Sequence, residues 1–161
     1  MESNLESIRH SLAHLLAAAV KEIYGADAKL AIGPTIENGF YYDIQFPTAT
    51  KIGEVELQKI EKKMRQLLPT WNKFSGREVD IDTAKSAFLG NEFKNELIDE
   101  IVSRDEKITI YKSGNFEDLC RGGHSENPAK EINPTAFKLT KLAGAYWRGD
   151  EKNPMLTRIY G

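Results

Sequence analysis

The sequence predicts a single α+β domain in which helices pack against a mainly antiparallel sheet. Three features predict this fold: long segments with helical spacing of apolar residues, short apolar segments typical of strands, and an irregular order of the two kinds. The chain has 161 residues, of which 40% are hydrophobic, so it is long enough to bury a core. Because no linker, repeat or low-complexity stretch divides it, we expect residues 1–161 to form one domain.

The first predicted element is a helix over residues 4–24. Ser3 and Glu6 have the spacing of a capping box at its start, and Gly25 suits its end. At helical spacing, its apolar stripe consists of Leu5, Ile8, Leu12, Leu15, Leu16, Ala19 and Ile23.

Two more helices and a set of short strands follow along the chain. One helix is expected over residues 54–68, ended by Pro69, and the other over residues 82–103, with a break near Gly90. Strands are expected at residues 28–33, 38–46, 71–79, 107–112, 116–120, 135–147 and 155–160, with a turn around Pro34 between the first two.

Composition excludes several classes of protein. No apolar run approaches the ~20 residues of a membrane span, and the polar, acidic start MESNLESIRH is unlike a signal or transit peptide. With 12 Gly and 6 Pro, the chain is neither low-complexity nor disordered in composition. The single cysteine allows no internal disulfide, which favours a reducing cytoplasm.

The charge of the chain is unevenly distributed. The formal net charge is −2, yet residues 130–161 carry +3 and the preceding residues −5. The basic C-terminal strands at 135–160 therefore present either a solvated strand face or an edge that faces phosphates. Charge alone does not separate these two interpretations.

All three histidines and the only cysteine fall in two motifs of equal spacing. His10 and His14 are four residues apart on the predicted helix, so they share one face, roughly opposite the apolar stripe and beside small alanines. Cys120 and His124 repeat this spacing in a loop, residues 120–124, whose glycine pair permits a close turn. We expect the two motifs to meet in one site, although two solvent-exposed histidines would also fit the helix pattern.

Two kinds of chemistry would use such a site. Three imidazole nitrogens and one sulfur form a suitable tetrahedral set for Zn²⁺. Without a metal, the same groups can bind and activate a water molecule, with a neutral imidazole as the base. Spacing does not choose between them.

Four longer stretches resemble a known family. HSLAHLLAAAV, IGPTIENGFYYD, FEDLCRGGHS and FKLTKLAGAYWRGDEKNPMLTRIYG are similar to the second N-terminal domain of threonyl-tRNA synthetases, the editing domain. This domain is related to that of alanyl-tRNA synthetases and to free-standing alanyl-tRNA editing proteins. The resemblance runs in order from about Ile8 to Gly161, and GFYYD and KLAGAYWRGD are of the threonyl type.

The sequence also departs from this family. Threonyl enzymes usually carry proline where this chain has Gly123, so we expect a more flexible loop, closer to the alanyl pattern. Only about nine residues precede the first histidine motif, where the family has a small extra domain. The chain stops at RIYG, where the family continues into its catalytic core, and no ATP-binding motif of that core is present. These features suggest an excised or short-fronted editing domain, or a stand-alone protein.

The resemblance implies hydrolysis of the ester that links a misattached serine to tRNA(Thr). Serine lacks one methyl group of threonine, and a pocket gains only about 1–3 kcal/mol from such a difference. A second site that accepts serine and excludes threonine would supply the missing discrimination. The two alternatives are a free-standing deacylase of mischarged tRNA and a non-catalytic tRNA-binding module.

The resemblance also implies roles for individual residues. His10 would position or deprotonate the attacking water, and Lys94 would stabilise the oxyanion or bind the ribose-bearing end. Asp118 would bind the amino group of the substrate. The implied catalytic residues are His10, Lys94 and Cys120, and the implied substrate-binding residues are His14, Tyr42, Asp118 and His124.

The remaining expectations concern tRNA and metal. Arg121, Lys138, Lys141 and Arg148 are candidates for the phosphates of the tRNA acceptor end, while Tyr146 and Trp147 would stack on a base unless Trp147 belongs to the core. The alanyl branch is associated with zinc at the site of His10, His14, Cys120 and His124. Four protein ligands would leave no open position for a catalytic water, so we predict that catalysis requires no metal.

Overall fold

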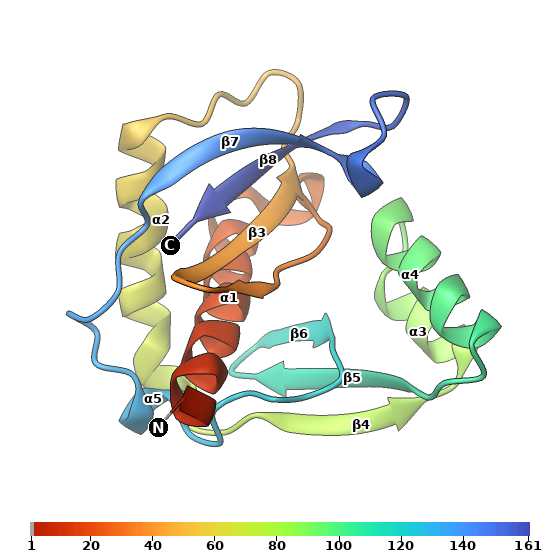
Figure 1. The fold of residues 1–161 in the computed structure, drawn as a ribbon, viewed down its shortest axis with the longest axis horizontal. Helices are drawn as coiled ribbons and strands as arrows, with labels where there is room; N and C mark the ends of the chain where they lie inside the picture. The colour runs from red at the N-terminus through yellow and green to blue at the C-terminus, as the bar shows by residue number, and fades with distance from the viewer. Residues whose placement is uncertain (1) are drawn as a thin grey trace.

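The computed structural model describes residues 2–161, with side chains from Asn4 onward. It confirms an α+β fold with antiparallel pairing, but the strands form two sheets rather than one. Figure 1 shows helix α1 (Glu2–Tyr24) between the two sheets, with helix α2 (Glu54–Leu67) along one side. The site described below lies where α1 meets the second sheet.

Helix α1 begins two residues earlier than predicted and ends at Tyr24. The end is set by Gly25, whose φ of +72° is readily available only to glycine. The side chain of Ser3, on which the predicted capping box depends, lies outside the described residues. Across residues 2–161, no helix is long and apolar enough to span a membrane.

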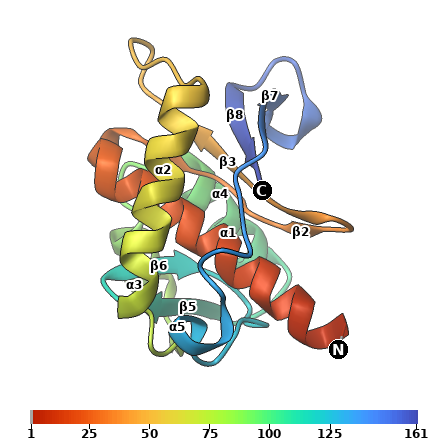
Figure 2. The ribbon, with the colours of Figure 1, turned by 90° about the vertical axis from the view of Figure 1, so that its left-hand side faces the viewer.

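The middle of α1 is buried on every side, which corrects the predicted single stripe. Residues 11–20 are all buried, including Ala13 and Ala17 on the face opposite the stripe, whereas Leu5 and Ile23 at its two ends are exposed. Helix α1 runs through the centre of the fold, and both α2 and the first sheet pack against it, from different sides (Figure 2). Small alanines let the neighbouring backbone approach closely.

The first sheet combines strands from residues 29–45 with strands from residues 141–160, the last part of the chain. Its order is β1-β3-β8-β7, with β2 paired to the end of β3, and every pairing is antiparallel. Its strands are β1 (Lys29–Leu30), β2 (Thr35–Ile36), β3 (Gly39–Gln45), β7 (Lys141–Tyr146) and β8 (Met155–Tyr160). Buried Asp43 and half-buried Arg158 face each other across β3 and β8 and form an ion pair with two hydrogen bonds, at 2.8 and 2.9 Å.

The second sheet has the order β4-β5-β6 and carries the cysteine motif after its last strand. Its strands are β4 (Ser75–Val79), β5 (Ile108–Ser113) and β6 (Phe116–Leu119). Helices α3 (Ile81–Ala87) and α4 (Glu92–Ser103) connect β4 to β5, with the break at Gly90 that the sequence predicts. Short turns of helix lie at Gly25–Asp27, Leu68–Thr70, Pro128–Glu131 (α5) and Trp147–Gly149.

Several predicted strand boundaries are wrong for identifiable reasons. The strand predicted at 135–147 exists only from Lys141, because side chains rather than a ladder hold the preceding segment: Leu139 N donates to Glu61, and Arg65 donates to the carbonyls of Pro134 and Phe137. The strand predicted at 71–79 begins at Ser75. The tight turn expected at Pro34 falls at residues 37–38, and the short helix α5 was not predicted.

Candidate active site

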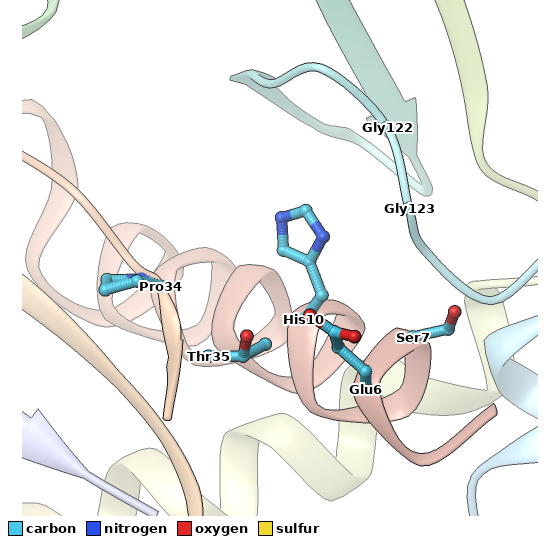
Figure 3. A pocket seen from close by; sticks show the side chains of 7 residues that line it. All are labelled: Glu6, Ser7, His10, Pro34, Thr35, Gly122 and Gly123. Atoms are coloured by element: carbon cyan, nitrogen blue, oxygen red, sulfur yellow. The ribbon is translucent and has the colours of Figure 1, made fainter. Parts of the chain in front are cut away.

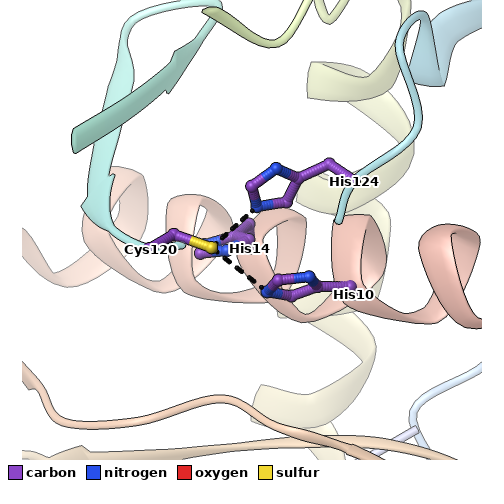
Figure 4. A group of neighbouring side chains, drawn as sticks. All are labelled: His10, His14, Cys120 and His124. Atoms are coloured by element: carbon purple, nitrogen blue, oxygen red, sulfur yellow. Dashed lines mark hydrogen bonds between the residues drawn. The ribbon is translucent and has the colours of Figure 1, made fainter. Parts of the chain in front are cut away.

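The two four-residue motifs meet at one point of the molecule. Helix α1 contributes His10 and His14, and the loop after β6 contributes Cys120 and His124 (Figure 4). One ligand atom from each residue lies within 4.8 Å of all the others. The Sγ atom of Cys120 is 3.1 Å from Nε2 of His124 and 3.4 Å from Nε2 of His10.

Glycine geometry shapes the loop that brings the second motif to the helix. Gly122 and Gly123 have φ values of +107° and +91°, and N–H of Gly122 donates to Sγ of Cys120 at 3.3 Å. Beyond them, N–H of Ser125 donates to Oγ of Ser11 on α1, which fastens the loop to the helix. Proline, with φ near −65°, cannot adopt this conformation at position 123, so this chain's loop differs in shape from a proline-bearing one.

Behind the histidines, a buried carboxylate joins four elements. Asp118 Oδ2 accepts hydrogen bonds from His14 Nδ1 at 3.0 Å and from the Tyr42 hydroxyl at 2.6 Å. Its Oδ1 lies 2.7 Å from Lys94 Nζ and accepts from the N–H of Leu119. Lys94 also donates to the Tyr42 hydroxyl and is only 3% exposed, although most lysines on helices are solvated.

This network sets the charge states of the site. Burial would raise the pKa of Asp118, but the Lys94 charge and His14 outweigh burial and hold it well below its usual range. Burial would lower the pKa of His14, yet Asp118 and the nearby Cys120 raise it to about 9. Burial would raise the pKa of Cys120, but hydrogen bonds from His10 and His124 and the nearby positive charge of His14 lower it to about 4. Cys120 is therefore a thiolate at neutral pH, stabilised by imidazole N–H groups.

A pocket of about 570 Å³ opens beside the cluster, and of the four cluster residues His10 alone lines it (Figure 3). The other lining residues are Glu6, Ser7, Pro34, Thr35, Gly122 and Gly123. The sticks in Figure 3 show the His10 ring standing between the glycine loop and the Pro34 segment. His14, by contrast, is 4% exposed and lies deeper. The cluster thus has one side chain at the pocket and three behind it.

The predicted basic residues do not line this pocket. Arg121 forms an ion pair with Glu106 at 2.8 Å, and Arg148 pairs with both Glu96 and Glu100. Lys138 and Lys141 line a separate groove against α2. None of these four side chains lines the pocket beside His10. Trp147 is a core residue that packs on Phe93, while Tyr146 is exposed.

Sequence reasoning missed the aromatic side chains around the cluster. The Phe74 ring stacks on His124, and the Tyr111 ring lies 4.7 Å from it. Both residues fall in segments predicted as strands, where an aromatic residue gives no sign of which neighbour it contacts. The structure explains the glycine at position 122, where a Cβ atom would lie 2.7 Å from the Tyr111 hydroxyl, but the sequence does not link that glycine to Tyr111.

The cluster residues fit a metal ion. Within the described part of the chain, buried Nε2 of His14 has no hydrogen-bond partner, while Nδ1 of the same ring is held by Asp118. A histidine whose outer nitrogen binds a carboxylate is typical of zinc sites. Three nitrogens and one sulfur within 4.8 Å suit tetrahedral Zn²⁺ after a small contraction. His10, His14, Cys120 and His124 could therefore hold a metal.

The two loop glycines should differ in how strongly they resist substitution. Gly123→Ala introduces only the strain of a positive φ, which we expect to lower the free energy of unfolding by about 1 kcal/mol. Gly122→Ala adds a collision with Tyr111 and should cost about 2–3 kcal/mol. Denaturant unfolding measures both, and Tyr111→Phe, which removes the obstructing hydroxyl, should restore part of the Gly122→Ala loss. Equal costs for the two glycines would contradict this account of the loop.

Comparison with known proteins now identifies the chain's relatives. Residues 108–160 match the family described as the threonyl and alanyl tRNA synthetase second additional domain. Over 160 residues, 99% of this chain, the threonine–tRNA ligases of Borreliella burgdorferi (strain ZS7) and Borrelia hermsii (strain HS1 / DAH) are 49% and 51% identical to it. That of Francisella philomiragia subsp. philomiragia is 49% identical over 159 residues, 98% of this chain. The chain spans 27% of the length of the first two relatives and 24% of the third. Over nearly its whole length the chain is therefore similar to a region of threonine–tRNA ligases, and its residues 108–160 match the second additional domain of threonyl and alanyl tRNA synthetases.

Proposed function

We propose that this chain is the editing domain of a threonyl-tRNA synthetase and hydrolyses the ester of Ser-tRNA(Thr). The observation that carries the proposal is the position of His10, which joins the buried cluster to the pocket. The similarity to threonine–tRNA ligases supplies the substrate class. The partners would be the acceptor end of tRNA(Thr) and the remainder of the synthetase, in the cytoplasm.

His10 has the geometry of a general base. The Cys120 thiolate can accept hydrogen bonds but cannot donate one. Nε2 of His10, 3.4 Å from Sγ, is therefore the donor and carries a proton. The neutral ring then keeps a lone pair on Nδ1, the nitrogen near Gly123 at the edge of the pocket. A water in the pocket can donate its proton there as it attacks the ester carbonyl. Cys120 and His124 serve by holding this tautomer and ring orientation.

The inner network supports this chemistry from behind. All four acceptor positions of Asp118 are used by His14, Tyr42, Lys94 and the N–H of Leu119. The expected role of Asp118 as ligand for the substrate's amino group has no acceptor position left, so we assign it to fixing His14. Lys94 uses two of its three N–H donors on Asp118 and Tyr42 and does not line the pocket beside His10, so we assign it to neutralising the buried Asp118 carboxylate.

Selective hydrolysis of the seryl ester is the direct test. The 161-residue chain is incubated with Ser-tRNA(Thr) and with Thr-tRNA(Thr), and release of the amino acid is followed against tRNA without protein. We expect hydrolysis of the seryl ester and at least tenfold slower hydrolysis of the threonyl ester, because the extra methyl group would be excluded at a cost of ~1–3 kcal/mol. Equal rates on the two esters would refute a site that accepts serine and excludes threonine. Hydrolysis of neither ester would favour a tRNA-binding module.

His10→Ala should abolish most of this activity without unfolding the chain. Loss of a general base typically lowers the rate ~10²–10⁴-fold. His10 lies at the rim of the cluster and is only half-buried, so the melting temperature should change little. Glu22→Ala, at an exposed position of the same helix, is the matched control and should keep full activity. A His10→Ala protein that remains as active as the control would remove His10 from the chemistry.

We propose that this activity needs no metal, although the cluster fits one. Zinc held by His10, His14, Cys120 and His124 would supply Lewis-acid chemistry, but it would occupy the lone pairs of all four residues. His10 would then have no lone pair with which to accept a proton from the attacking water.

Chelation tests the metal proposal. The chain is dialysed against a strong chelator, its zinc content is measured, and deacylation is assayed on the same sample. We expect activity to persist when zinc falls below one-tenth of the protein concentration, and stoichiometric zinc to inhibit. Activity that disappears with the zinc and returns on its addition would show instead that the four residues act as ligands.

A further inference from the structure

His124 is held between two flat rings. The Phe74 ring stacks on one face at a centroid distance of 4.2 Å and an interplanar angle of 12°. The His10 ring covers the other face at 4.3 Å and 28°. Only the ring edge is left free to form hydrogen bonds, and Nε2 on that edge meets Cys120 at 3.1 Å.

The backbone at His124 does not fix this ring by itself. The residue follows two glycines with positive φ and lies in neither a helix nor a strand. The nearest loop anchor after it is the hydrogen bond from Ser125 to Ser11. An imidazole on such a segment would rotate among several rotamers unless a neighbouring side chain excluded them.

Phe74 is well placed to exclude them because it is itself anchored. Its N–H donates to the carbonyl of Glu126, which ties the start of the second sheet to the histidine loop. Its ring meets Trp71 edge-on at 5.3 Å and 86°, and Trp71, only 1% exposed, lies parallel to Phe116 at 6.1 Å. The aromatic group Trp71, Phe74 and Phe116 is thus a rigid wall beside the cluster.

We propose that Phe74 is a positioning residue that holds the His124 imidazole in the plane where its Nε2 meets Cys120. The inference rests on the proposed function for its kinetic consequence. Correct placement of His124 holds the Sγ atom of Cys120, 3.1 Å from its Nε2, and Sγ in turn contacts Nε2 of His10 at 3.4 Å and orients that ring toward the pocket. Phe74 does not line the pocket, and its closest ring contact in the cluster is with His124 at 4.2 Å, against 5.9 Å to His14, so it acts on the chemistry through these histidines.

A set of substitutions separates positioning from bulk packing. Phe74→Met keeps an apolar side chain but removes the flat face, whereas Phe74→Tyr keeps the face. Phe46→Met is the matched control, because Phe46 is also half-buried and meets an aromatic ring, Tyr24, away from the cluster. The melting temperature of each protein reports the loss of packing alone.

Kinetics on Ser-tRNA(Thr) give the first measurement. We expect Phe74→Met to lower kcat about tenfold with KM within about twofold, since a displacement of ~1 Å in a catalytic group can cost up to ~10² in rate. Phe74→Tyr should stay within about threefold of the unaltered chain, and Phe46→Met should keep its kcat. Unchanged kcat in Phe74→Met, or an equal loss of kcat in Phe46→Met at the same melting temperature, would overturn the proposal.

A second measurement does not depend on activity and therefore distinguishes failure of this inference from failure of the proposed function. Ring resonances of His124, assigned with His124→Asn, report its mobility by NMR. We expect one sharp set in the unaltered chain and in Phe74→Tyr, and broadened or doubled resonances in Phe74→Met. A single sharp set in Phe74→Met, with the same Nε2 shift as in Phe74→Tyr, would show that the loop holds His124 without Phe74.

Discussion

The candidate site depends first on the buried Asp118 carboxylate. A buried carboxylate without partners would be several kcal/mol unfavourable, and it is tolerated here because a lysine, an imidazole, a phenol and a backbone N–H surround it. These donors come from α4, α1, β3 and β6, so one side chain specifies how four elements pack. The same interaction fixes the hydrogen of His14 on Nδ1 and leaves Nε2 facing the cluster. Fold and site are therefore stabilised by a single buried network.

Much of the site could be predicted because it depends on local spacing. The i, i+4 relation of His10 and His14 holds for any helix, and the break at Gly90 and the end at Gly25 follow from glycine's conformational range. That the two motifs form one site was predicted because together they contain every histidine and the only cysteine of the sequence. The resemblance located Lys94, which helix periodicity alone would have placed in solvent.

What could not be predicted depends on contacts between distant segments. The apolar stripe of α1 was incomplete because the helix is surrounded, and the sequence does not show which other elements will cover a face made of alanines. The segment before β7 is held by Glu61 and Arg65 of α2, more than seventy residues earlier, so its strand-like pattern was misleading. Arg148 looked like part of a phosphate-binding strip, but its acidic partners lie on α4. Long-range ion pairs leave no periodic signal in a sequence.

The cluster can serve water activation or metal binding, and the two uses compete for the same lone pairs. As a thiolate, Cys120 accepts N–H groups from His10 and His124, so these rings carry their protons on Nε2. A metal would take the place of those protons on the same nitrogens, and it would also have to displace the Nε2 proton of His14, whose pKa is raised to about 9. With its proton on Nε2, the His10 ring keeps a lone pair on Nδ1 and can act as a base at the pocket. With a metal on Nε2, the neutral ring would carry its proton on Nδ1 and would have no lone pair left to act as a base. The choice between the two states is therefore made by what occupies the centre of the cluster, with no change required in the surrounding fold.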